Sequence, residues 1–156
     1  MKKILFAALL LPLLSLAQEK ESKDGMKFEH GSWKEILAKA KAENKYIIMD
    51  CFTTWCGPCK FMDATIFPTK EAGDYFNAKF LNVKVQFDST AEDNEEVKAW
   101  KKDMKEIEKE YSIAAYPTYL VFDPSGTPVA RSVGSTKDAV EFITRGKDAQ
   151  IPEKQY

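Results

Sequence analysis

The sequence predicts one α/β domain in which a mixed central sheet is flanked by helices on both faces. A continuous apolar run at 45–52 is typical of a strand that is covered on both sides. A further strand is expected at 80–87, before a segment with helical spacing of apolar residues. Two late strands, 118–122 and 128–133, flank the turn sequence Asp123-Pro124-Ser125-Gly126, which indicates a hairpin. With 156 residues, the chain has the size of a single domain.

The first 17 residues have the pattern of a signal peptide. Lys2 and Lys3 precede an apolar stretch at 4–14, and Ser15-Leu16-Ala17 is a small-residue cleavage site. The stretch is shorter than the about 20 residues that span a bilayer, and no cysteine follows it at the cleavage site. We therefore expect cleavage after Ala17, no membrane or lipid anchor, and a periplasmic or secreted mature protein.

The rest of the chain divides into a flexible polar leader, a folded domain and a C-terminal tail, at 18–25, 26–150 and 151–156 respectively. Residues 26–28 are expected to add a short edge strand. Ser32, with Glu35 three residues later, is a capping-box signature and predicts a helix through Glu43.

Four further helical segments are expected. One begins at Cys56 or Gly57 and ends near Ile66, because Pro68 follows closely, and another starts around Thr69. Apolar residues at helical spacing between Val97 and Tyr111 predict a long helix. The acidic residues near its start are stabilised by the positive end of the helix dipole. A last helix is expected from about Lys137 to Arg145.

The most chemically specific feature is Trp55-Cys56-Gly57-Pro58-Cys59-Lys60, placed where a strand gives way to a helix. Two cysteines with two residues between them form a reversible dithiol/disulfide pair. Unpaired N–H groups and the dipole at a helix N-terminus lower a thiol pKa from about 8.5 into a range of roughly 3.5–7.5. We therefore expect Cys56 to be the exposed nucleophile and Cys59 the thiol that resolves a mixed disulfide.

Two other interpretations of Cys56 and Cys59 are a fixed disulfide and half of a zinc site. A bridge across two residues constrains little unfolded-chain entropy. Zinc would need two further ligands, and only Cys51 and His30 are available besides carboxylates, so we expect no metal. Cys51 is expected to be a buried hydrophobic residue, with regulatory oxidation as the alternative. His30 is expected at the surface or in a cap.

These motifs resemble the thioredoxin superfamily. Asp50, six residues before the first cysteine, matches the family's buried acid, and Lys84 matches the lysine that pairs with it. Tyr116-Pro117-Thr118 matches the cis-proline loop that faces the active site, and Val133-Gly134-Ser135 matches the glycine turn beside the substrate groove. The resemblance covers roughly 28–147, and it implies the thioredoxin fold and thiol–disulfide oxidoreductase activity.

Two features depart from thioredoxin itself. Ala64 stands where the family usually has a helix-kinking proline, and the run Lys60–Pro68 is more similar to thioredoxin-like envelope proteins and to the terminal domain of periplasmic thiol:disulfide interchange proteins. The stretch from Asp88 to Lys109 is longer and more charged than its thioredoxin counterpart. Both departures bear on the physiological partner.

The resemblance also implies roles for individual residues. A carboxylate in an apolar strand is costly unless it is paired or functional, so Asp50 is either in a structural ion pair with Lys84 or a proton acceptor that helps Cys59. Burial would raise the pKa of Asp50 toward the range useful for that work. Trp55 is either a packing residue or a partner contact. The residues expected to hold a substrate backbone are Trp55, Gly57, Pro58, Tyr116, Pro117 and Gly134.

The expected partners are envelope proteins that contain disulfides, and an upstream dithiol protein that supplies electrons; no bound cofactor is expected. Gly57-Pro58 resembles reducing thioredoxins and favours a reductase, with an oxidase or isomerase, or a binding module with an inert disulfide, as alternatives. After cleavage the net charge is about −3, from 21 basic and 24 acidic side chains, which favours neither nucleic acid nor an anionic membrane surface. We expect a monomer.

Overall fold

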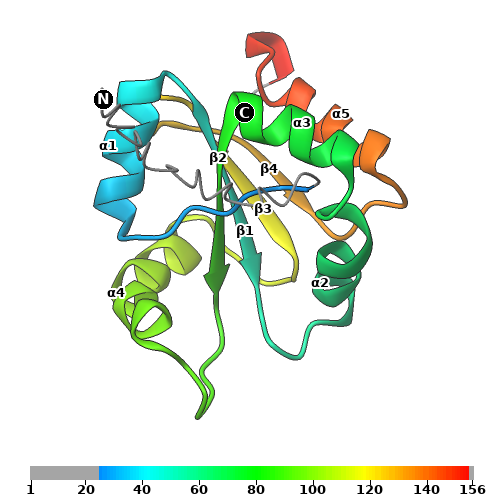
Figure 1. Ribbon diagram of the computed structural model, residues 1–156. Helices are drawn as coiled ribbons and strands as arrows, with labels where there is room; N and C mark the ends of the chain where they lie inside the picture. Colours follow the sequence, from blue (N-terminus) through cyan, green and yellow to red (C-terminus); the bar gives the residue numbers. More distant parts are fainter. Residues whose placement is uncertain (1–24, 155–156) are drawn as a thin grey trace, which may run out of the picture.

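The computed structural model describes residues 25–154, which form an α/β unit of four strands and five α-helices (Figure 1). The expected signal peptide at 1–17 and all but the last residue of the leader lie outside the described residues. The helices are α1 (Trp33–Glu43), α2 (Gly57–Phe61), α3 (Lys70–Lys79), α4 (Glu95–Glu110) and α5 (Ala139–Asp148). A π-helical turn, η1 (Met62–Ile66), follows α2, and a short 3-10 helix, η2 (Pro152–Lys154), lies in the tail.

The central sheet is mixed, as predicted. Its strands are β1 (Tyr46–Phe52), β2 (Phe80–Gln86), β3 (Thr118–Phe122) and β4 (Pro128–Val133), in the order β2-β1-β3-β4. β1 and β2 are parallel, whereas β1–β3 and β3–β4 are antiparallel. The expected hairpin therefore joins β3 and β4 at one side of the sheet.

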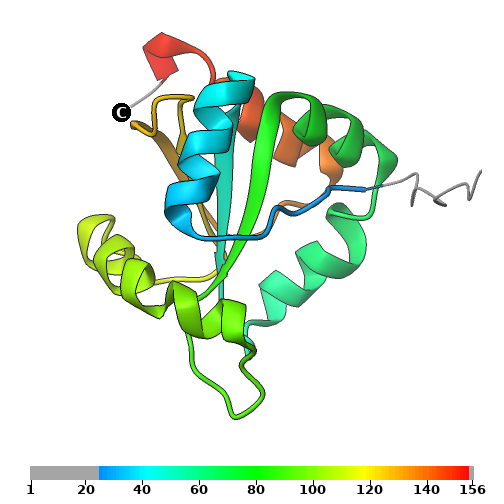
Figure 2. The same ribbon diagram turned by 60° about the vertical axis from the view of Figure 1, so that its left-hand side comes forward.

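Helices cover both faces of the sheet, which confirms the predicted layers (Figures 1 and 2). The face of β1 that carries Ile47, Met49 and Cys51 packs on apolar residues of α1 and α4. The opposite face carries Ile48 and packs on residues of η1, α3 and α5. Since neighbouring strand residues point to opposite faces, Asp50 lies on the η1 side and Cys51 on the α1 side.

Local capping explains where the helices begin. The Ser32 hydroxyl and the Glu35 carboxylate form the predicted capping box at the start of α1. The last helix begins at Ala139, two residues later than expected, because Asp138 is extended and its carboxylate accepts the N–H of Glu141 at 2.8 Å.

The edge strand expected at 26–28 is reduced to a single parallel bridge between Phe28 and Asn82. The Glu29 N–H donates to the Asn82 carbonyl at 2.8 Å, after which the chain turns at Gly31 (φ +120°) toward α1. A glycine is suited to this turn because side chains rarely adopt a positive φ. The segment therefore crosses the edge of β2 instead of extending along it (Figure 1).

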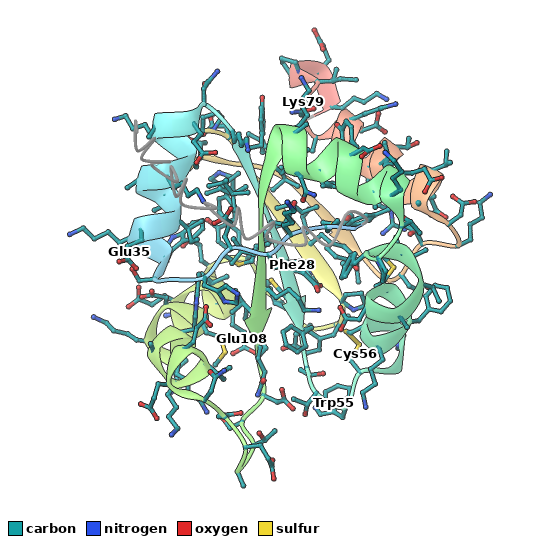
Figure 3. The ribbon with its side chains drawn as sticks, in the orientation of Figure 1. Phe28, Glu35, Trp55, Cys56, Lys79 and Glu108 are labelled. Atoms are coloured by element: carbon teal, nitrogen blue, oxygen red, sulfur yellow. A yellow bond between two sulfur atoms is a disulfide. The ribbon has the colours of Figure 1, made fainter. Side chains whose placement is uncertain are left out.

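The topology places three connections at the same end of the strands. β1 and β2 are parallel, so the loops that follow them leave the sheet at this end, and the antiparallel β3 begins there. The motif around Cys56 follows β1, and Tyr116-Pro117 precedes β3. Figure 3 shows Trp55 and Cys56 at this end of the molecule, with Lys79 at the other.

Candidate active site

Cys56 and Cys59 form a disulfide at the start of α2. Cys56 is the N-cap, and its sulfur accepts the backbone N–H of Cys59 at 3.1 Å. The segment continues through η1, so Cys56 precedes ten consecutive helical residues, 57–66. The sulfur of Cys56 therefore lies where backbone N–H groups stabilise negative charge.

The expected exposure of Cys56 is wrong for this oxidised form. Cys56 is 3% exposed and Cys59 is 2% exposed, so both belong to the buried residues. The exposed groups are their neighbours Gly57 and Pro58. A Cβ on Gly57 would meet nothing within 4 Å, and its φ is not positive. Neither space nor backbone conformation therefore demands a glycine at position 57.

Trp55 is 69% exposed, and its ring makes a T-shaped contact with Tyr116, with ring centroids 6.0 Å apart at 89°. Tyr116 also contacts Phe87, at 5.9 Å between centroids, and burial raises its pKa to about 12. Trp55 has little packing to lose and presents a large aromatic surface beside the disulfide.

The Tyr116–Pro117 peptide bond is cis, as the resemblance implies. The Pro117 carbonyl accepts the N–H of Gly134 at 2.8 Å, and the Gly134 carbonyl accepts a hydrogen bond from Arg145 Nη1 at 2.9 Å. Gly134 has φ +86°, which favours glycine. These bonds bring the two predicted substrate loops, which are distant in sequence, together.

Asp50 is 4% exposed, and its Oδ2 lies 3.3 Å from Lys84 Nζ, so the expected pair is present. Its Oδ1 is buried and has no hydrogen-bond partner within residues 25–154. Burial raises the pKa of Asp50 to about 6; Lys84 opposes that shift, and the charge of Asp63 adds to it. Asp50 thus has an acceptor oxygen available for a proton, and the pKa of its carboxyl group is close to neutral pH.

Two site carboxylates were not predicted from the sequence. Asp63, in η1, also pairs with Lys84. Asp88, just after β2, accepts hydrogen bonds from Thr54, two residues before Cys56. Spacing could have indicated the first, because Asp63 lies four residues after Cys59 and therefore on the same helix face. No local pattern identifies Asp88.

The loop that carries Asp88 is held by the buried carboxylate of Asp93. Asp93 accepts hydrogen bonds from Gln86 Nε2 and Lys101 Nζ, both at 2.7 Å, and from the N–H and hydroxyl of Thr90. These bonds hold the pKa of Asp93 well below its usual range. Asp93 therefore has a structural role in this loop.

The remaining candidates have structural roles. Cys51 is a free cysteine in the apolar layer under α1 and α4, and burial raises its pKa well above the usual value. His30 is exposed and pairs with Glu96 at 3.0 Å. Across residues 25–154, no group of three or more histidine, cysteine or carboxylate side chains is arranged to bind a metal ion. None of the helices there has the length and apolar character to cross a bilayer.

Residues 33–150 match the family described as a thioredoxin-like domain. The chain is 31% identical over 112 residues to "Thioredoxin AMT13" of Alternaria alternata, which covers 72% of this chain and 79% of that protein. It is 39% identical to a protein of Bacteroides thetaiotaomicron described as a "putative disulphide-isomerase", with a TM-score of 0.63 over 81% of this chain and 93% of that one. The "DsbH Oxidoreductase" structure is similar in fold, with a TM-score of 0.65, 21% identity, and coverage of 86% and 91%.

Proposed function

The chain belongs to the thioredoxin-like domain family and is a thiol–disulfide oxidoreductase; we propose that it is exported and reduces or exchanges disulfides of envelope proteins. The observation that carries the proposal is the Cys56–Cys59 pair, whose first sulfur caps a helical segment and accepts a backbone N–H. The sequence pattern at 1–17 supports the exported location. The proposed substrates are therefore proteins in an oxidising compartment.

In the proposed reaction the reduced protein gives two electrons to a substrate disulfide. The Cys56 thiolate attacks one substrate sulfur, the substrate S–S bond breaks, and the other substrate sulfur leaves as a thiolate. The Cys59 thiol passes its proton to Asp50, and the resulting thiolate attacks the sulfur of Cys56. The Cys56–Cys59 bond forms, and the second substrate sulfur is released. An upstream dithiol protein then reduces the pair again.

The proposed substrate surface surrounds the disulfide. Trp55 offers an exposed ring that contacts Tyr116, and Gly57 and Pro58 are exposed between the cysteines. The loops of Pro117 and Gly134 are hydrogen bonded to each other. An extended substrate segment bound there would place its sulfur next to Cys56. We propose that the protein acts on such segments as a monomer.

The test is the reduction potential of the pair, measured on the mature protein equilibrated with graded thiol/disulfide buffers. A value of about −270 to −230 mV would place the protein with reductases. The Asp50→Asn variant tests the role of Asp50 in the exchange reaction, because the substitution keeps the side-chain shape but removes the proton acceptor. A pair that stays oxidised and unreactive in every buffer would contradict the proposal and leave the binding-module interpretation.

Disulfide isomerisation is the second candidate, and the 39% identity with the Bacteroides thetaiotaomicron protein favours it. A potential above roughly −180 mV would support this function over reduction. The direct assay is the recovery of activity by a substrate whose disulfides have been scrambled. An isomerase would restore activity without a net supply of electrons, whereas a reductase would only reduce the substrate.

A further inference from the structure

Lys84 is shared between two carboxylates that come from different elements. Its Nζ lies 3.3 Å from Asp50 Oδ2 in β1 and closer to Asp63 Oδ1 in η1. Asp50 is buried, whereas the side chain of Asp63 is 42% exposed. The closer carboxylate is therefore the more hydrated one, and the buried carboxylate has the weaker contact with the cation.

Three phenyl rings enclose the ammonium group. Lys84 Nζ lies 4.7 Å from the ring centroid of Phe52, 5.3 Å from that of Phe67 and 5.4 Å from that of Phe28. Ammonium groups within about 6 Å of a ring centroid are attracted to the ring face. The rings and the two carboxylates together define the position of Nζ, so losing one carboxylate would let it move toward the other.

We propose that Asp63 is a positioning residue: it draws the Lys84 ammonium toward the active-site helix and leaves the buried Asp50 only partly neutralised. The proposal rests on the proposed function, in which Asp50 takes the proton of Cys59. Asp63 lies four residues after Cys59, so the same helical segment carries the thiol and the group that positions the lysine.

The chemical consequence concerns the strength of Asp50 as a base. A carboxylate paired fully with a lysine binds a proton weakly, whereas an unpaired buried one is already protonated at neutral pH. A general base works best when its pKa is near the ambient pH. By sharing Lys84, Asp63 holds the proton affinity of Asp50 between these limits. Burial and the charge of Asp63 both act to raise the pKa of Asp50.

The groups that face Asp50 come from each element around it. Lys84 is in β2, Asp63 is in η1, and Tyr119 is opposite Asp50 in the register of β3. Burial raises the pKa of Tyr119, so its hydroxyl stays uncharged near neutral pH. The cysteine of α2, Cys59, is held in the disulfide and does not titrate in the oxidised protein. Of these groups, only Lys84 and Asp63 carry charges that act on Asp50 near neutral pH.

The first test is a titration of the Asp50 carboxyl carbon by NMR in the oxidised protein, with and without Asp63→Asn. The substitution removes a negative charge and releases Lys84 toward Asp50, and both effects lower the pKa of Asp50. We expect its midpoint to fall by about one pH unit. Asp74→Asn, which breaks the exposed ion pair with Lys70, is the matched control and should leave the midpoint unchanged.

The second test asks whether Asp63 acts through the lysine. The same Asp63→Asn change is made in a Lys84→Met background, or in Lys84→Gln if the first does not fold. A positioning role predicts that the shift shrinks to half or less, because no ammonium remains to be moved. An equal shift in both backgrounds would overturn the positioning role and leave Asp63 as a simple neighbouring charge.

The third readout is the pH profile of mixed-disulfide resolution by Cys59. In Asp63→Asn the acid limb of this profile should shift to lower pH, together with the Asp50 midpoint. An unchanged midpoint overturns the role of Asp63, whatever the turnover. If the unmodified protein turns over no disulfide while the midpoint still shifts, the proposed function fails and the coupling of Asp63 to Asp50 stands.

Discussion

The Asp88 carboxylate accepts hydrogen bonds from both the backbone N–H and the hydroxyl of Thr54, with the N–H at 3.0 Å from Oδ1 and 3.1 Å from Oδ2. The bond joins the loop after β2 to the turn that leads into the disulfide. Asp93 holds the Asp88 loop through Gln86 and Lys101. The turn before Cys56 is therefore hydrogen bonded to a loop whose own position is fixed by hydrogen bonds.

We therefore expect Asp88→Ala to loosen the approach to Cys56. The part-buried N–H of Thr54 would lose its acceptor, which costs about 1–3 kcal/mol of unfolding free energy, whereas Thr54→Val removes only the hydroxyl and costs about 1 kcal/mol. Urea unfolding of the oxidised proteins measures both. Equal stability of Asp88→Ala and the unmodified protein would contradict this account.

The order of the two cysteines in the reaction is open to a trapping experiment. In Cys59→Ser no thiol remains to resolve the mixed disulfide at Cys56, so covalent adducts with substrate should accumulate by about tenfold or more over the unmodified protein. Mass spectrometry under non-reducing conditions measures the adduct. The matched variant is Cys56→Ser, and its trapping in place of Cys59→Ser would reverse the assignment.

Much of the fold could be predicted because its signals are local. The capping box of Ser32 and Glu35, the apolar run that became β1 and the hairpin before Gly126 each depend on neighbours in sequence. The reduced edge strand at Phe28 depends instead on where Asn82 bonds the chain. Local patterns do not report such distant pairings.

The site shows the same division. Cys56 and Cys59 follow from their spacing and their position before a helix. The burial of both cysteines does not follow, because their spacing in sequence does not determine how exposed they are. Asp63 was missed for a related reason: its partner Lys84 is 21 residues away in sequence. A charged residue on a helix is normally a solvated one, and only the fold shows the shared lysine.

Trp55 is expected to serve substrate binding and to contribute little to stability. Its exposed ring makes a T-shaped contact with Tyr116, so Trp55→Ala should change unfolding free energy by about 0.5 kcal/mol or less, as exposed positions do. The loss of aromatic contact should lower kcat/KM for a protein disulfide by about tenfold. Reduction of a small disulfide such as oxidised glutathione is the control, and an equal loss there would assign Trp55 to the chemistry instead.

Asp50 is expected to make stability depend on pH in a defined direction. Its pKa is about 6 in the folded protein and near 3.8 when unfolded, so the folded state binds more protons between these values. The stability that this group contributes is therefore complete below about pH 4 and is lost as the pH rises through 6. A difference of about two pKa units corresponds to at most about 3 kcal/mol.

Asp50→Asn removes this titration and leaves Lys84 paired with Asp63. Relative to the unmodified protein, the variant should therefore gain stability between pH 4 and pH 7.5, by an amount on the order of 1–3 kcal/mol. Urea unfolding of both oxidised proteins at the two pH values measures the difference without interference from thiol titration. Asp148→Asn, at an exposed ion pair with Lys154, is the control. Parallel stability curves for Asp50→Asn and the unmodified protein would show that burial does not raise the pKa of Asp50, and they would remove its basis as the proton acceptor for Cys59.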